Sequence, residues 1–288
     1  MLNKLFVLCL LALLSGAATA QPLRLVAAGA SITSVIQRLD LDSLLVGLDS
    51  TSAPLMAGRD LPNVGYQRQL SAEGILSLRP DVLLGSEEMG PAAVLAQLRE
   101  AGVEVIVLNA QANLPTLYEN IGAVGQRFSR GAQAEHLVSE LKAQVAALPQ
   151  APAERPRALF LLSHSAGSLL VGGAGTAGDS LIELGGMYNP VAGQFSQYRS
   201  LSAEALLQLR PEWLITTSQS IEQAGGSAAL LALQPALAKT PAGQKGQLIS
   251  VDGALLVGGF NPAVVDTLAQ LRQAAAQSAN MAQRANRK

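Results

Sequence analysis

One stretch of this chain is written twice, and this repeat constrains the fold more than any other feature of the sequence. The segment at 65–86 matches the segment at 196–217 without a gap, at a constant offset of 131 residues (65 to 196). In each copy a serine suited to capping precedes a short run of helical apolar spacing, and Arg-Pro ends that run before an apolar strand. The identical pairs are Arg68/Arg199, Leu70/Leu201, Ser71/Ser202, Ala72/Ala203, Glu73/Glu204, Leu76/Leu207, Leu78/Leu209, Arg79/Arg210, Pro80/Pro211 and Leu83/Leu214. We therefore expect two halves of one architecture, each with the same helix and strand.

Apolar runs typical of buried strands alternate with segments of helical spacing in both halves of the chain. This alternation predicts an α/β fold in which each half has a mostly parallel central sheet flanked by helices. Ligands of such sheets bind beyond the carboxyl ends of the strands. A helix capped by Ser31 is expected after the first strand. The expected strands are at 23–30, 44–49, 81–86, 103–109, 158–164, 168–173, 213–217 and 247–253.

The alternation stops in the middle of the chain. Apolar residues at helical spacing from Leu137 to Leu148 predict one long helix there, and a proline-rich stretch at 149–158 follows it. The sequence therefore predicts two lobes joined by one long helix, with a cleft between them. The lobes are an N-terminal α/β lobe at 21–113 and a C-terminal α/β lobe at 150–288, and the linking segment is at 114–149.

The first twenty residues have the pattern of a cleavable signal peptide. Lys4 is followed by an apolar run at 5–14, which is too short to span a bilayer, and a small-residue cleavage pattern is present at 18–20. We expect residues 1–20 to be removed and the mature chain to begin at Gln21. The single cysteine, Cys9, lies within the apolar run, so the mature chain has no thiol, which fits an oxidising compartment.

Charge and composition exclude several classes of function. The formal net charge is −1, and the one small basic cluster is at 284–288. This balance argues against a nucleic-acid-binding chain. No segment after the signal peptide is long and apolar enough to be transmembrane.

The sequence has no recognisable catalytic machinery. It lacks the nucleophile elbow, the zinc-protease and P-loop motifs, and the haem-attachment pattern, so we expect a protein that is not an enzyme. A G-x-G-x-x-G match at 173–178 raises the alternative of a nucleotide-dependent enzyme, but the acidic residue of a dinucleotide site is missing. We expect instead a tight turn before a helix at the cleft, which could still present N–H groups to an anion.

Two histidines remain as polar candidates. His136 falls in the predicted long helix beside Glu135 and Glu140 and is expected to be solvated. His164 ends a predicted strand, so it could contact a ligand or be a structural polar residue. With two histidines and no mature cysteine, a metal site built from several protein ligands is not expected.

Tyr66 is the strongest candidate for a ligand-binding residue. It follows Gly65 in a loop and has Arg68 two residues further on. A nearby guanidinium would favour the phenolate, which is a hard anionic oxygen that suits ferric iron. The alternative is that Tyr66 packs or lies at the surface. The second copy has Gln197 at the equivalent position, so the two lobes differ chemically here.

Glu73 and Glu204 occupy equivalent positions in the repeated helices, at the second helical residue. Acidic residues there stabilise the first turn of a helix. As a pseudo-two-fold pair, they could also dock on a symmetric partner.

The segment VGYQRQLSAEGILSLRPDVLLGSEEMGP is similar to periplasmic haem-binding proteins, the substrate-binding components of bacterial ABC haemin importers of the HmuT, PhuT and ShuT type. The resemblance extends over the mature chain, including AAGASIT, GGAGTAGDSLIELGG and LSAEALLQLRPEWL. The two-lobe order is shared with a wider class of helix-linked binding proteins, which includes binders of cobalamin and of ferric siderophores. Those ligands are the alternative to haem.

The resemblance implies a role for each matching residue. Tyr66 would be the axial ligand of ferric haem b, carried as a non-covalent ligand, and Arg68 would stabilise the phenolate or a haem propionate. His164 would be a possible second ligand, either on the same iron or on a second haem. Glu73 and Glu204 would meet arginines of an ABC haem permease, which works with its ATPase. A monomer in the periplasm is expected.

Overall fold

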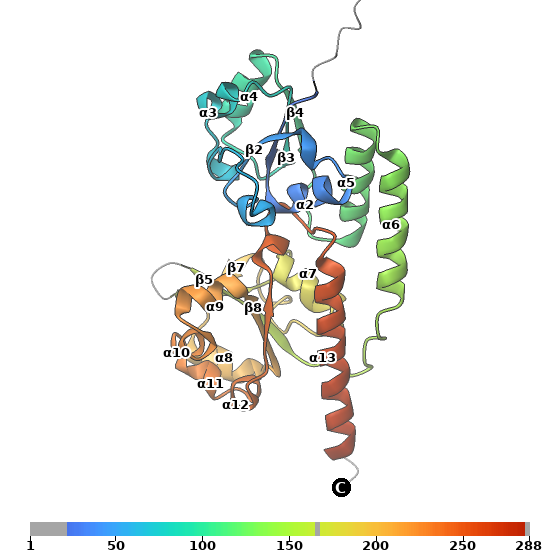
Figure 1. The fold of residues 1–288 in the computed structure, drawn as a ribbon. Coiled ribbons are helices and arrows are strands. Elements are labelled where there is room, and N and C mark those ends of the chain that lie inside the picture. Colours follow the sequence, from blue (N-terminus) through green and yellow to red (C-terminus); the bar gives the residue numbers. More distant parts are fainter. Residues whose placement is uncertain (1–21, 165–167, 286–288) are drawn as a thin grey trace, which may run out of the picture.

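The computed structural model describes residues 22–164 and 168–285. The predicted signal peptide at 1–20 lies outside the described residues, as do the last residues of the basic cluster. Figure 1 shows two α/β lobes, one above the other, with long helices packed along one side of both. The predicted fold class, two lobes with sheets flanked by helices, is confirmed.

The first lobe is built on a parallel four-stranded sheet with the order β2-β1-β3-β4. Residues of β1 and β3 are fully buried, as expected for strands covered on both faces. The strands are β1 (Leu25–Ala28), β2 (Leu45–Leu48), β3 (Val82–Ser86) and β4 (Glu104–Leu108). The helices are α2 (Ala30–Arg38), α3 (Ala72–Ser77) and α4 (Ala92–Glu100), with 3-10 helices η2 (Asp42–Leu44), η3 (Ala53–Met56) and η4 (Gln67–Gln69).

The second lobe has a five-stranded sheet with the order β7-β6-β5-β8-β9. β5, β8 and β9 are parallel, whereas β6 and β7 run antiparallel to their neighbours. The strands are β5 (Ala158–His164), β6 (Ser168–Gly172), β7 (Tyr198–Arg199), β8 (Trp213–Thr217) and β9 (Leu248–Val251). The helices are α7 (Ala177–Leu184), α8 (Ala203–Leu209), α9 (Ser218–Ala224), α10 (Ser227–Ala232), α11 (Pro235–Ala238), α12 (Pro241–Lys245) and η5 (Gly253–Leu256).

The linking segment at 114–149 contains two helices where the sequence predicted one. The predicted long helix is present as α6 (Gly131–Ala146), but α5 (Leu114–Arg127) precedes it and packs against it. The break between them is sharp because Ser129 has a left-handed backbone, with φ 57°. A start signal for α5 is present in the sequence, since the Asn113 side chain caps it by accepting from the Thr116 N–H at 2.8 Å. A third long helix, α13 (Val264–Ala285), packs against α6 and α7.

The sequence repeat is a structural repeat. Ser71 and Ser202 cap α3 and α8, each accepting a hydrogen bond from the N–H three residues on, at 3.3 and 3.2 Å. Both helices are followed by an arginine in the left-handed region, Arg79 and Arg210, each with φ 47°. The predicted serine caps and Arg-Pro stops are therefore confirmed.

The structure extends this repeat to residues that the sequence comparison did not include. The Arg24 guanidinium donates to the Leu78 carbonyl at 2.7 Å, and the Arg157 guanidinium donates to the equivalent Leu209 carbonyl at 3.3 Å. The backbone N–H of each arginine is bound by the acidic residue after Arg-Pro, Asp81 at 2.8 Å and Glu212 at 3.2 Å. In each lobe, an arginine before the first strand thus ties that strand to the carbonyl end of the repeated helix.

The predicted serine cap of the first helix is wrong. The N-cap of α2 is Gly29, which makes no side-chain cap and has φ 114°. The free N–H groups at this end are instead bound by side chains that follow β2: Asp49 accepts from the Gly29 N–H at 2.9 Å, and Thr51 accepts from the Ala30 N–H at 3.1 Å. Ser31 is left available for a contact with the second lobe.

Candidate functional site

The backbone around Tyr66 is fixed on both sides. Before it, the Gly65 carbonyl accepts from the Ser50 N–H at 2.8 Å, and after it, the Gln67 carbonyl accepts from the Gly90 N–H at 2.9 Å. Ser50 follows β2 and Gly90 follows β3, so the loop lies at the carboxyl ends of the first lobe's strands. Gly65 has φ 93°, which favours glycine at this turn.

The Tyr66 side chain is left open on this fixed backbone. It is 41% exposed, whereas the next residue, Gln67, is fully buried. The phenol is thus accessible to a ligand or a partner. The structure thus places Tyr66 at the sheet edge where ligands of α/β folds bind.

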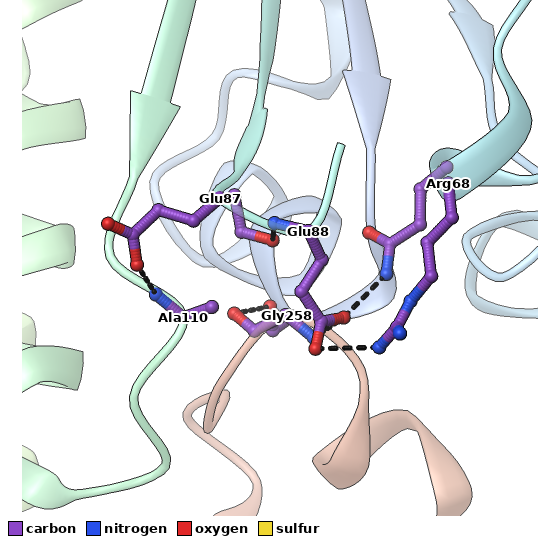
Figure 2. A network of polar contacts seen from close by, with 8 residues as sticks. Arg68, Glu87, Glu88, Ala110 and Gly258 are labelled. Carbon is purple, nitrogen blue, oxygen red and sulfur yellow. Dashed lines mark hydrogen bonds and ion pairs between the residues drawn. The ribbon is translucent and has the colours of Figure 1, made fainter. Parts of the chain in front are cut away.

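Arg68 is engaged by a residue that sequence reasoning did not single out. Its guanidinium donates to Glu88 at 2.8 Å, and the Arg68 side chain is 55% exposed whereas that of Glu88 is 24% exposed. Figure 2 shows this ion pair at the end of β3. A guanidinium has five N–H donors in a fixed fork, so one ion pair leaves donors for a second acceptor.

Glu88 is the centre of a polar network. Its second carboxylate oxygen accepts from the Gln67 side-chain amide at 2.8 Å and from the Gly258 N–H at 3.1 Å. Gly258 follows η5 in the second lobe, and its carbonyl accepts from the Ser31 hydroxyl at 2.8 Å. In Figure 2, the Glu88 side chain contacts Arg68 of its own lobe on one side and Gly258 of the second lobe on the other. The loop that carries Tyr66 and Arg68 is therefore linked to the second lobe.

Glu87 makes a separate contact in the same region. Its carboxylate accepts from the Ala110 N–H at 3.3 Å, and its own N–H is bound by the Leu108 carbonyl at 2.9 Å. Figure 2 shows Glu87 and Glu88 turning to opposite sides. The carboxyl ends of β3 and β4 are held together in this way. A signal for both glutamates was available, because they directly follow a predicted buried strand.

His164 is the last residue of β5, where its backbone pairs with Ser168 of β6. The carboxyl end of β5 is the edge of the second sheet at which a ligand residue is expected. The side chain of His164 lies outside the part of the chain that the structure describes. His136 is exposed on α6.

The expected tight turn before a helix is present at 173–178, and the first three of its amides are bound within the protein. Thr176 caps α7 by accepting from the Asp179 N–H at 3.1 Å. The first three amides of the turn have protein acceptors: Gly173 donates to the Gln197 carbonyl, Ala174 to the Phe195 carbonyl and Gly175 to the Asp179 carboxylate. The Asp179 carboxylate thus lies against the turn, where its negative charge disfavours an anionic ligand.

Glu73 and Glu204 are both exposed in the first turns of α3 and α8. The backbone N–H of Glu204 and the Ser202 side chain hold the pKa of the Glu204 carboxyl below its ordinary value. Its side chain is therefore charged at neutral pH. The two glutamates thus lie at equivalent positions, one in each lobe.

Within residues 22–164 and 168–285, no group of three His, Cys, Asp or Glu side chains is arranged to hold a metal ion. None of the helices in these ranges has the length and apolar character needed to cross a membrane.

Comparisons with known proteins identify the fold family. A family model described as periplasmic binding protein matches residues 25–255. The chain is 35% identical to the periplasmic heme-binding protein HutB of Vibrio cholerae, whose crystal structure matches with a TM-score of 0.81 over 88% of this chain and 98% of that one. It is 40% identical to a periplasmic heme-binding protein from Pseudomonas aeruginosa, with a TM-score of 0.79 over 88% of this chain and 92% of that one. The resemblance to periplasmic haem-binding proteins is confirmed.

A curated relative differs in its named ligand. The chain is 25% identical over 240 residues to a cobalamin-binding protein of Halobacterium salinarum, a match that covers 81% of this chain and 64% of that protein. The chain thus spans less than two thirds of the length of this relative. These relatives are binding proteins rather than enzymes. On the match over most of its length, the chain belongs to the periplasmic binding protein family.

Proposed function

We propose that this protein captures ferric haem between its lobes through the Tyr66 phenolate and delivers it to an ABC permease. The observation that carries the proposal is the exposed Tyr66 side chain on a backbone fixed on both sides, at the carboxyl edge of the sheet. The identity of 35–40% to two periplasmic heme-binding proteins supports haem as the ligand.

The chemistry of the site suits ferric iron. A phenolate is a hard anionic ligand and favours Fe(III) over Fe(II). The fixed backbone reduces the conformational entropy that Tyr66 loses on binding. Arg68 would contribute positive charge either to the phenolate or to a haem propionate, through the donors that its pair with Glu88 leaves free.

His164 is proposed as a possible second ligand from the other lobe. It ends β5, at the carboxyl edge of the second sheet. From there it would bind the same iron opposite Tyr66 or serve a second, stacked haem. The endpoint of a haemin titration gives the number of haems bound.

Glu73 and Glu204 are proposed to dock on the permease, which works with an ATPase. Their exposure and their equivalent places in the two lobes suit a partner with two-fold symmetry. The protein would act in the periplasm as a monomer, exported through a signal peptide at 1–20. Membership of the periplasmic binding protein family supports export.

The second candidate ligand is cobalamin or a ferric siderophore. It is favoured by one observation, the 25% identity to a protein named as cobalamin-binding. Binding of these ligands would not need a phenolate on haem iron. Loss of the Tyr66 hydroxyl therefore separates the two proposals.

The test is a titration of the mature protein with haemin, followed in the Soret and charge-transfer bands. The native protein is expected to give a saturable ferric phenolate-type spectrum, and Tyr66→Phe is expected to lose the charge-transfer band. Tyr188→Phe is the matched control, because Tyr188 is 45% exposed and its backbone is also fixed by two hydrogen bonds, to Pro156 and Ala158. Tyr188 lies beside the start of β5, at the opposite end of the strand from His164. If the native protein gives no saturable Soret change, or Tyr66→Phe keeps the native spectrum, the proposal fails, and cobalamin and ferric siderophores are titrated next.

A further inference from the structure

The segment that connects β9 to α13 is hydrogen-bonded to the first lobe through Gly258. We call residues 253–263 the crossing segment. Both backbone polar groups of Gly258 bind the first lobe: the N–H donates to Glu88 at 3.1 Å and the carbonyl accepts from Ser31 at 2.8 Å. Gly258 has φ 77°, and a Cβ at this position would lie 3.0 Å from the hydroxyls of both Ser31 and Ser86. A side chain at this position would therefore disturb the hydrogen bond between Gly258 and Ser31.

Glu88 divides its carboxylate between the two lobes. One oxygen binds the Arg68 guanidinium at 2.8 Å, and the other accepts from Gln67 at 2.8 Å and from Gly258 at 3.1 Å. Gln67 is fully buried and belongs to the loop of Tyr66. It can hold the Glu88 side chain in place without help from Arg68. Arg68 and Gly258 therefore donate to the same carboxylate, whose orientation is fixed by Gln67.

We infer that Glu88 is a positioning residue that couples two interactions. One is the binding of an anionic group of the ligand by Arg68, and the other is the hydrogen bond between Glu88 and Gly258 that joins the lobes. When a ligand carboxylate pairs with Arg68, Arg68 neutralises less of the negative charge on Glu88. The hydrogen bond from the Gly258 N–H to Glu88 then becomes stronger, and the crossing segment is held more tightly. When the lobes move apart and the hydrogen bond from Gly258 is lost, Glu88 binds Arg68 more strongly and competes with the ligand for the Arg68 guanidinium. The two effects are the two sides of one coupling free energy.

This inference rests on the proposed function only in naming a haem propionate as the anionic group. The coupling between Arg68 and Gly258 is a property of the protein without haem. Failure of haem binding and failure of the coupling are therefore distinguished by separate measurements.

The coupling is tested by hydrogen exchange of single amides in the protein without haem, with 15N-glycine labelling. Arg68→Ala is expected to slow exchange of the Gly258 amide about threefold, because a hydrogen bond to an unneutralised carboxylate is stronger. Glu88→Gln is expected to speed it about fivefold, because the charged acceptor is lost. The two substitutions thus shift exchange in opposite directions, whereas a purely structural ion pair predicts faster exchange in both.

Two controls are built into the protein. The Gly253 amide lies in the same segment but donates to Gln219 within the second lobe at 3.0 Å, so its exchange is expected to stay unchanged. Arg59→Ala removes another exposed ion pair of the first lobe, with Asp42, and is expected to leave Gly258 unchanged. Exchange of Gly258 at or above the native rate in Arg68→Ala, or at the native rate in Glu88→Gln, overturns the inference.

A second arm adds the ligand. Gallium protoporphyrin, a diamagnetic analogue of ferric haem, is expected to slow exchange of Gly258 by a similar factor in the native protein and to have no such effect in Glu88→Gln. Bound gallium protoporphyrin that leaves Gly258 unchanged in the native protein overturns the link to the ligand.

Discussion

Tyr66 and Gln67 are adjacent in the chain and have opposite surroundings. The Tyr66 side chain is 41% exposed, while that of Gln67 is fully buried and donates to Glu88 at 2.8 Å. The buried amide anchors the 3-10 helix η4, and the anchored backbone holds the phenol in place. One residue of the loop thus supplies the candidate ligand and the next supplies its support.

Gln67→Ala is expected to lower the free energy of unfolding by about 1–3 kcal/mol, because it removes a buried donor to a carboxylate and leaves a cavity. It is also expected to weaken haemin binding, since η4 loses its anchor. Urea denaturation and haemin titration measure the two effects. Gln69→Ala is the matched control, because Gln69 is exposed in the same 3-10 helix. Equal stability and affinity of the two variants would contradict the anchoring role.

Gly65→Ala is expected to displace Tyr66 and also to destabilise the protein through backbone strain at residue 65. Gly65 has φ 93°, and an alanine there costs on the order of 1 kcal/mol. Gly58 has φ 98°, and a Cβ added there would face open space, so Gly58→Ala carries similar strain away from the site. Both variants should lose similar stability in thermal unfolding, but only Gly65→Ala should shift the charge-transfer band of bound haemin. A shifted band in Gly58→Ala would argue that strain alone perturbs the site.

The arginines that join each first strand to its repeated helix should contribute to stability without affecting binding. Arg24 donates to the carbonyls of Leu78 and Arg79 through three hydrogen bonds, whereas Arg157 makes a single one of 3.3 Å to Leu209. Arg24→Ala is therefore expected to lower the free energy of unfolding by about 1 kcal/mol, and Arg157→Ala by less. Chemical denaturation checks the order, with Arg99→Ala, on the exposed side of α4, as control. The reverse order would show that the distances do not set the stabilisation.

Reversing the charge of Glu73 or Glu204 is expected to impair delivery while leaving haemin affinity unchanged. Each substitution to arginine places like charges against the proposed permease surface and should reduce haem transfer about tenfold or more. The measurement is haem uptake by proteoliposomes containing the permease and its ATPase. Glu135→Arg, at an exposed position of α6, controls for the change in net charge. Full uptake with both Glu73 and Glu204 reversed would exclude them as docking residues.

Local signals predicted much of the fold. The alternation of apolar runs with helical spacing located the described strands of both sheets except β7, and the caps at Ser71 and Ser202 lie where the repeat placed them. Tyr66 stood out because it follows a glycine in a loop and precedes an arginine. Each of these features depends on residues that are close together in the chain, so spacing and residue type reveal them.

The features that the sequence analysis missed depend on residues that are far apart in the chain. Ser31 looked like a helix cap because serine is common there, but its hydroxyl binds Gly258 instead. Glu88 carried no motif, and its bond to Gly258 joins residues 170 positions apart. In each case tertiary contacts overrode or completed a local preference.

The bond between Ser31 and Gly258 also has a consequence for biogenesis. It joins residues 227 positions apart, so the buried Ser31 hydroxyl acquires its partner only after the intervening chain has been made. Contacts of such long sequence separation form late and slowly. This bond therefore cannot join the two lobes until residue 258 has been synthesised and has reached the first lobe, so the first lobe folds before this contact with the second is made.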